Sequence, residues 1–435
     1  MTIVCRLENG ADDSHIYGAI DTGEPMGADQ RVATTIRRAV NVVVYVSDAL
    51  RSDHLGCYGA RFVNTRTIDE LAAGGVRFDQ AISAAPWTAP SMTSMVTGLY
   101  AHHHGYLHWD AELDPTTETL FRALSAHGCE VGTFVFDTSY LFRDLPEANV
   151  LGTSETLDGA IAWLRANRSK PFLLFFHNWA THMPYDILHA ERKDWLAAKQ
   201  EIIGGIQADS AAALEATREA YRQAVERQSE TLVASMLEEL ESLGLREQTV
   251  FAFTSDHGES WGERFVAKQD VKGVYHMHGA AVYDEIVQVP LILSAPGRLE
   301  PGTVTSQVRS VDLMPTLLEL AGVPSGEIDG ASLVPLTDGR EDGHRPAVIA
   351  GTDMGALTKL AVRMPPWKLI LHVESGKEEA YNLDLDPREL DSRPSDVPPE
   401  LCEIVFRELE SAERHELTEE EEATVARRLA DLGYL

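Results

Sequence analysis

The sequence predicts an α/β fold with a large, mostly parallel sheet flanked by helices, followed by a small C-terminal antiparallel sheet with helices. Two patterns predict it. Over most of the chain, continuous apolar runs rich in β-branched and aromatic residues alternate with amphipathic stretches, as in consecutive βαβ units. After about residue 345, short strand-like segments follow one another without intervening helices, which favours an antiparallel sheet.

Continuous apolar runs indicate strands that are buried on both faces of the large sheet. These runs lie at 41–47, 131–136, 172–176, 250–253 and 290–293. Between them, apolar residues recur at helical spacing, and glycines end two of the expected helices. The expected helices cover 117–127, 157–167 and 212–243.

The C-terminal part has a different order of elements. Its strand candidates are short and separated by turn residues, and acidic helices are expected over 399–432. The strand candidates lie at 347–350, 360–363, 367–371 and 380–383. The predicted organisation is an N-terminal extension of residues 1–40 without an assigned function, a large α/β domain of 41–345 and a small α+β domain of 346–435.

Composition limits the classes of partner. The 435 residues include 37 basic and 68 acidic side chains, and the net charge of -31 argues against a cationic surface for nucleic acid or an anionic membrane. The four cysteines are too scattered for a disulfide framework or a zinc knuckle. No basic leader or apolar run of about 20 residues is present, so we expect a cytoplasmic chain without a membrane partner.

Polar residues follow three of the predicted parallel strands, at the sheet edge where ligands of open α/β sheets bind. Asp48 and Arg51 follow the first apolar run, His177 and His182 end and follow the run at 172–176, and the pair Asp256 and His257 ends the run at 250–253. Two carboxylates and an imidazole are suitable ligands of a divalent cation. A single Asp in such a place is equally well a turn or helix cap, but a cap leaves His257 unexplained, and Gly258 permits a close backbone approach.

The segment APWTAPSMTSMVTG begins a predicted helix and has two compatible interpretations. Thr88 precedes the helix and Pro90 lies in its first turn, which is the pattern of an N-cap. A helix start also stabilises an anion, so a hydroxyl there beside a metal could attack a phosphorus or sulfur centre. Thr88 is therefore a candidate nucleophile as well as a candidate cap.

Seven segments between residue 41 and about residue 390 together resemble the sulfatase family of the alkaline phosphatase superfamily. Their order is that of the family, which makes the match far more specific than any one segment. They are NVVVYVSDALRSDHLGCYG, APWTAPSMTSMVTGLYAHHHG, HNWATHMPYD, FTSDHGESWGE, HMHGAAVYDEIVQVPLILSAPG, SVDLMPTLLELAGVP with the following IDGASLVPL, and EEAYNLDLDPREL. The resemblance implies an alkaline-phosphatase-like sandwich as the fold of residues 41–345.

The resemblance also assigns expected roles to single positions. Asp48, Asp256 and His257 match the metal ligands, and Thr88 matches the nucleophile, which also binds the metal. His182 and His278 match histidines that touch the transferred group or the leaving oxygen, and we expect Arg51 to bind substrate with them. His276 could belong to a second metal site. Structural roles are expected for His102, His103, His104 and His108.

Several positions depart from the sulfatase pattern. Thr88 stands where sulfatases carry the cysteine or serine that becomes formylglycine, and Met92 replaces the arginine of that motif. Ala49 replaces a second aspartate, His257 an asparagine, and Gly279 stands where the family has a lysine. These changes resemble the threonine-nucleophile branch of the superfamily, so we expect no formylglycine.

The sequence therefore predicts a metal-dependent hydrolase of small phosphate or sulfate esters that acts through a covalent intermediate on Thr88. Phosphate mono- or diesters are slightly favoured as substrates. One divalent ion is expected, with manganese or zinc preferred to calcium or magnesium because one ligand is an imidazole. The alternatives are a phosphoryl transferase of the phosphoethanolamine or glycerophosphate type and a non-catalytic binding module on the same fold.

Overall fold

The computed structural model describes most of the chain after residue 39. The described residues are 40–109, 111–138, 141–154, 156–185, 192–208, 210–261, 278–279, 281–352 and 355–412. The expected N-terminal extension, His276 and the acidic segment after residue 412 lie outside them.

Among the described residues, one sheet contains eight strands in the order β4-β3-β5-β1-β6-β7-β2-β8. Only β7 runs antiparallel to its neighbours in this sheet, so the expected large, mostly parallel sheet is confirmed. The strands are β1 (Asn41–Ser47), β2 (Val76–Ile82), β3 (Glu130–Val135), β4 (Val150–Thr153), β5 (Phe172–Asn178), β6 (Thr249–Ser255), β7 (Gln288–Ser294) and β8 (Gly302–Arg309).

The three central strands β5, β1 and β6 are buried along their whole length, as their apolar runs predict. They are parallel and in register at their carboxyl ends, where Ser47 lies opposite Asn178 on one side and Ser255 on the other. The residues that follow these strands therefore emerge side by side at one edge of the sheet.

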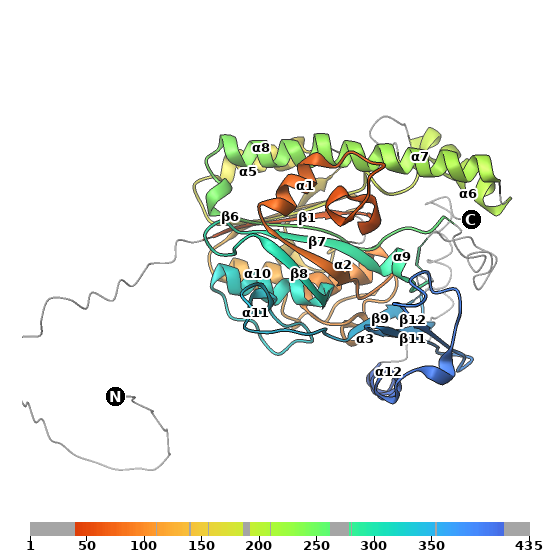
Figure 1. The fold of residues 1–435 in the computed structure, drawn as a ribbon. Helices are drawn as coiled ribbons and strands as arrows, with labels where there is room; N and C mark the ends of the chain where they lie inside the picture. The colour runs from red at the N-terminus through yellow and green to blue at the C-terminus, as the bar shows by residue number, and fades with distance from the viewer. Residues whose placement is uncertain are drawn as a thin grey trace, which may run out of the picture. The chain divides into compact units, whose positions relative to one another are not determined.

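Helices cover both faces of the large sheet. Figure 1 shows α7 and α8 across one face with α1 beside them, and α2 and α10 on the opposite face. The α-helices that precede the C-terminal sheet in the chain are α1 (Arg66–Ala73), α2 (Thr88–Thr97), α3 (Ala101–His104), α4 (Leu120–Ala126), α5 (Asp158–Asn167), α6 (Arg192–Gln207), α7 (Ala211–Arg227), α8 (Ala234–Ser242), α9 (Asp284–Val287), α10 (Leu313–Ala321) and α11 (Val334–Thr337). Short 3-10 turns occur at Ser52–His54, Gly56–Tyr58, Pro146–Ala148, Arg246–Gln248, Ser310–Asp312 and Pro394–Asp396.

The expected helix over 212–243 is interrupted by a π-helical segment, η4 (Gln228–Val233), between α7 and α8. Gln228 lies in this segment and is fully buried. Its side-chain amide donates hydrogen bonds to Ser47 Oγ at 3.0 Å and Tyr45 Oη at 3.2 Å. The irregular turn thus ties the long helix to the carboxyl end of β1, and π segments of this kind are common near functional sites.

The C-terminal part of the described chain forms a second, antiparallel sheet of four strands in the order β12-β11-β10-β9. It packs with helix α12 and shares an apolar core with Ala84, Ala85 and Tyr100, which flank the segment that carries Thr88. This confirms the small antiparallel sheet, while the boundary at residue 345 stays a prediction. The elements are β9 (Ala347–Gly351), β10 (Lys359–Met364), β11 (Trp367–His372), β12 (Glu378–Asn382) and α12 (Pro399–Ser411).

Candidate active site

The carboxyl ends of β1 and β6 bring two carboxylates and an imidazole together. Ligand atoms of Asp48, Asp256 and His257 all lie within 4.8 Å of one another, and all three residues are buried. His257 Nε2 is 3.6 Å from Asp48 Oδ1 and 3.4 Å from Asp256 Oδ2. The structure thus brings together the three side chains that the sequence analysis selected as metal ligands.

Backbone contacts fix the orientation of Asp256. Its Oδ1 accepts hydrogen bonds from the backbone N–H groups of Ala49 at 3.2 Å and His257 at 2.9 Å. Ala49 has a φ of 57°, a left-handed conformation that is uncommon for a residue with a Cβ, and it turns the chain after β1. Oδ2 of Asp256 accepts no hydrogen bond from the described residues and remains available to a ligand.

Gly258 allows the loop after β6 to pack closely against helix α9. A Cβ added at this glycine would lie 2.3 Å from the backbone oxygen of Glu285. The glycine N–H donates to the carbonyl of Ile286 at 2.6 Å. The glycine next to the Asp256-His257 pair is therefore required by a close backbone approach, as the sequence suggested.

The cluster has the properties of a divalent cation site. Oδ1 of Asp48 and Oδ2 of Asp256 are buried and lack hydrogen-bond partners among the described residues, which is costly unless a cation occupies the space between them. Burial and the neighbouring Asp256 carboxylate hold the pKa of Asp48 well above its ordinary range. His257 Nδ1 donates to the carbonyl of Gly258 at 2.7 Å, so its Nε2 is the nitrogen that carries the lone pair. The donor set therefore fits one divalent metal ion.

Thr88 is the first residue of α2, and its hydroxyl oxygen lies 3.3 Å from His257 Nε2. The N-cap position belongs to Trp87, whose side chain caps nothing, so the expected N-cap role of Thr88 is wrong. Because its hydroxyl does not cap the helix, it is available to the cluster. Ser83 and Ser91 hold α2 in place, since both of their hydroxyls donate to the backbone oxygen of Asp256, at 2.6 and 2.7 Å.

His182 and His278 lie on the same side of the cluster. The rings of His257 and His278 are 4.3 Å apart between centroids, and the rings of His278 and His182 are 5.2 Å apart. His182 stacks on Trp179, and its Nδ1 donates to the carbonyl of Met183 at 2.8 Å. Burial, followed by the charge of His278, holds the pKa of His182 well below its ordinary value, so this ring is neutral at pH 7.

Glu259 and Lys199 also belong to the site, although no sequence pattern selected them, and His177, noted at a strand end without a role, joins it. His177, the penultimate residue of β5, places Nε2 at 3.1 Å from Asp48 Oδ2, and burial lowers its pKa to about 4. Glu259 Oε1 lies 2.9 Å from His278 Nδ1, and burial raises the pKa of this carboxyl to about 8. Lys199 on α6 is fully buried, and burial holds its pKa well below the ordinary value although the nearby Glu259 and Asp48 carboxylates raise it.

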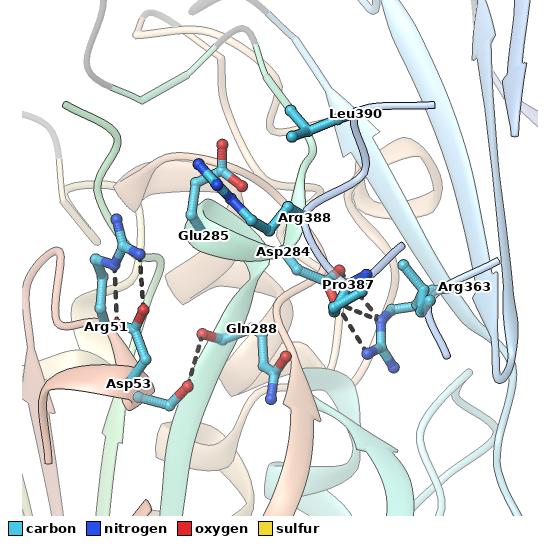
Figure 2. Close-up of a pocket in the computed structure, with 11 residues that line it drawn as sticks. Arg51, Asp53, Asp284, Glu285, Gln288, Arg363, Pro387, Arg388 and Leu390 are labelled. Atoms are coloured by element: carbon cyan, nitrogen blue, oxygen red, sulfur yellow. Dashed lines mark hydrogen bonds and ion pairs between the residues drawn. The ribbon is translucent and has the colours of Figure 1, made fainter. Parts of the chain in front are cut away.

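Arg51 lines a cavity of about 460 Å³ whose lining does not include the Asp48, Asp256 and His257 cluster. Its guanidinium donates to both carboxylate oxygens of Asp53, at 2.9 and 2.7 Å, and to the carbonyl of Glu259 at 3.0 Å. Figure 2 shows this pair at one side of the cavity, with Glu285 and Arg388 facing it. The predicted role of Arg51 in substrate binding stays a prediction, and the cavity offers both acidic and basic groups.

Two of the positions that depart from the sulfatase pattern, Met92 and Gly279, have ordinary structural roles here. Met92 is completely buried in the apolar core beneath α2, and the N–H of Gly279 donates to the carbonyl of Pro86 at 2.9 Å. His104 is also structural, since its Nε2 lies 3.0 Å from Ser94 Oγ and 3.2 Å from the carbonyl of Pro90. No helix within the described residues is long and apolar enough to cross a bilayer.

Known proteins resemble this chain over most of its length. The sulfatase family model matches residues 40–323, and the model for the C-terminal region of N-sulphoglucosamine sulphohydrolase matches residues 276–411. Arylsulfatase K of Rattus norvegicus is 24% identical over an alignment of 454 positions, gaps included, that covers 86% of this chain and 78% of that protein. A low-salt glycan biosynthesis sulfotransferase of Haloferax volcanii is 27% identical over 304 residues, which cover 67% of this chain and 64% of that protein.

Solved structures show the same fold. The structure of a 2-O GAG sulfatase superposes with a TM-score of 0.68 at 19% identity and covers 91% of this chain and 92% of that one. At this identity the likeness establishes the fold, whereas the family match spans well over half of the sequence. The chain therefore belongs to the sulfatase family and is an ester hydrolase of that family.

Proposed function

We propose that the protein hydrolyses small phosphate or sulfate esters through a covalent intermediate on Thr88, without formylglycine, and that phosphate mono- or diesters are its better substrates. The observation that supports this most directly is the 3.3 Å separation between Thr88 Oγ1 and His257 Nε2, inside a cluster of buried carboxylate oxygens that lack hydrogen-bond partners among the described residues. A hydroxyl in such a place is poised to become a nucleophile.

Asp48, Asp256, His257 and Thr88 would hold the metal ion. When bound, a divalent cation lowers the pKa of a coordinated hydroxyl and neutralises charge on a non-bridging oxygen of the substrate. An imidazole beside two carboxylates favours manganese or zinc over calcium or magnesium. His177 hydrogen-bonds the other oxygen of Asp48 and so orients that ligand.

The residues of the chain supply the remaining steps. Thr88 loses its hydroxyl proton to solvent, Oγ1 attacks phosphorus or sulfur in line, the new ester bond forms, and the bond to the leaving oxygen breaks. His278, whose Nδ1 lies 2.9 Å from Glu259 Oε1, protonates the leaving oxygen from its other ring nitrogen. Water then attacks the same centre and gives a proton to His278, which the first step left neutral. The bond to Oγ1 breaks and Thr88 leaves as the oxyanion, while the neutral His182 accepts a hydrogen bond from the attacking water at its Nε2.

The nucleophile favours phosphate over sulfate. Threonine is a secondary alcohol and cannot be oxidised to an aldehyde, so the covalent ester must be resolved by attack of water on phosphorus or sulfur. Met92 also replaces the arginine of the formylglycine motif with an apolar side chain. The names of the similar proteins point instead to sulfate esters, so both classes belong in the test.

The test is a substrate panel assayed with enzyme stripped by a chelator and reloaded with manganese or zinc. The panel contains aryl phosphate monoester, phosphate diester, phosphonate and sulfate, and kcat/KM is measured for each. We expect the highest value for a phosphate mono- or diester, and its loss in Thr88→Ala. A clear preference for the sulfate would contradict the substrate class, and full activity of Thr88→Ala would contradict the nucleophile.

Transfer to an alcohol is the second candidate, because one similar protein, from Haloferax volcanii, is described as a sulfotransferase. The covalent intermediate on Thr88 would then be resolved by an acceptor hydroxyl in place of water. Assays with added glycerol separate the two functions. If the glycerol ester is the main product at millimolar glycerol, the result supports transfer. If only free phosphate or sulfate forms, the result supports hydrolysis.

A further inference from the structure

We propose that His102, His103 and Glu408 form a second divalent-metal site, of the kind that binds zinc, which clamps helix α12 to helix α3. His102 and His103 lie on α3, and Glu408 lies in the last turns of α12. The site is built from residues outside the Asp48, Asp256 and His257 cluster and does not depend on the proposed reaction.

The three side chains converge on one point. Ligand atoms of all three lie within 4.8 Å of one another. Oε2 of Glu408 is 3.2 Å from His102 Nε2 and 3.5 Å from His103 Nε2. Zinc bonds of about 2.0–2.2 Å place neighbouring ligands of a tetrahedral ion about 3.3–3.5 Å apart, so these separations suit a shared ion. Ser411 Oγ, 3.0 Å from His103 Nε2, and water can complete the shell.

A further carboxylate, that of Asp329, contacts the other ring nitrogen of His103. Asp329 Oδ2 lies 2.8 Å from His103 Nδ1 and also accepts the backbone N–H of Tyr100 at 2.7 Å. Histidines that bind metal commonly donate their second ring N–H to a carboxylate, which fixes the tautomer and orients the ring. With Nδ1 donating to Asp329, the lone pair of His103 lies on Nε2, the nitrogen that faces Glu408.

The surroundings suit a structural ion. His102 is 2% exposed and Glu408 is 9% exposed, whereas a quarter of the His103 side chain is open to solvent and gives an ion access. α12 packs through Leu401 and Val405 onto the core that contains Tyr100 and Ala101. An ion at this place would join the C-terminal helix to the segment next to the Thr88 helix.

The experiment measures zinc in the full-length chain carrying Asp256→Asn, which disables the other cluster. The protein is stripped with a chelator and titrated with zinc, and bound metal is counted by elemental mass spectrometry. We expect one equivalent, which is lost in Glu408→Gln and in His103→Gln. Asp329→Asn should still fill at saturating zinc but bind about 10–100-fold more weakly. The control His127→Gln changes an exposed histidine just after helix α4 and should leave the zinc content unchanged.

Thermal unfolding separates loss of metal from loss of fold. Zinc should raise the unfolding temperature of the parent, and leave that of Glu408→Gln and His103→Gln at the value measured in chelator. His103→Gln keeps the test decisive if Glu408→Gln does not fold, because His103 is the more exposed ligand. Absence of zinc from the Asp256→Asn parent, or an equal zinc content with and without His103, would overturn the proposal and leave a hydrogen-bonded cluster.

Discussion

The Oγ1 atom of Thr88 lies 3.3 Å from Nε2 of His257, although the two residues are 169 positions apart in the chain. Backbone contacts produce this proximity, because Ser83 and Ser91, on either side of Thr88, both donate to the carbonyl of Asp256. The start of α2 is thereby fixed to the loop after β6. A hydroxyl held this way needs no rearrangement of the chain to reach the metal ligands.

Thr88→Ala should lower kcat by at least about 10³-fold, because the attacking oxygen is removed. Bound metal should fall only modestly, since Asp48, Asp256 and His257 remain. Thr88→Ser is the matched control and should keep measurable turnover because it retains a hydroxyl at the same place. Steady-state kinetics and elemental analysis of the three proteins check this, and equal kcat in Thr88→Ala and the parent would rule out the nucleophile.

Asp256→Asn should lose bound metal and activity together. The substitution keeps the size of the side chain and can still accept the two backbone hydrogen bonds at Oδ1, so the loop should keep its conformation. It removes the charge that a divalent ion needs. Metal affinity is the measurement, and excess manganese or zinc should restore little activity. A variant that binds metal as tightly as the parent would contradict the assigned ligand.

The two histidines should differ in their dependence on the leaving group. His278→Gln should slow esters of alkyl alcohols by about 10²–10⁴-fold and affect nitrophenyl esters much less, because only a poor leaving group needs a proton. His182→Gln should slow both to a similar extent, since the low pKa of this buried ring makes it a hydrogen-bonding group at pH 7. The measurement is a plot of log kcat against the pKa of the leaving alcohol. A steeper dependence in His182→Gln than in His278→Gln would contradict the assigned roles.

Gly258→Ala should destabilise the protein, by about 1–3 kcal/mol in the free energy of unfolding, through a steric clash. The added Cβ would lie 2.3 Å from the backbone oxygen of Glu285, which has little freedom to move. Gly204→Ala on α6 is the control, because a Cβ there meets nothing within 4 Å and a helix interior favours alanine. Denaturant unfolding should show opposite signs for the two changes, and equal stability would contradict the close approach.

Stability should fall with decreasing pH in part because His104 is buried in its neutral form. Its Nδ1 accepts the N–H of Tyr106 at 3.0 Å, and burial lowers its pKa to about 3. Between the unfolded pKa of about 6.5 and the folded value, the unfolded chain binds more protons, so stability is present above about pH 6.5 and is lost as pH falls.

This residue should account for about 2 kcal/mol of unfolding free energy lost between pH 6.5 and 5. His104→Gln should reduce the pH dependence of unfolding by that amount. An unaltered slope in His104→Gln would show that the ring is free to take up a proton in the folded state.

The sequence predicts best where one physical requirement dominates. β1, β5 and β6 are buried on both faces, so their apolar runs are visible in the sequence. β2 was not predicted because its buried and partly exposed residues alternate irregularly, and its pairing with β7 and β8 includes a register shift. The π-helical turn of η4 depends on the tertiary contacts of Gln228, which no local pattern reveals.

The candidate site also combines residues that the sequence reveals with residues that only tertiary packing brings in. Asp48, Asp256 and His257 follow strands that adjoin in the sheet, so the rule for strand ends finds them. Lys199 lies on a helix without a motif, and only the packing of α6 brings its charge near Glu259 and Asp48. The N-cap expected at Thr88 is displaced to Trp87, because the pattern of polar residue and following proline locates a helix start only to within a residue or two.

The most direct test of the account is mass spectrometry of acid-quenched enzyme during turnover of an aryl phosphate or sulfate. We predict that the peptide containing Thr88 gains the mass of one phosphoryl or sulfuryl group, that fragmentation places the group on Thr88, and that Thr88→Ala lacks it. An unmodified Thr88 peptide under conditions of rapid turnover, or the group on another residue, would contradict it.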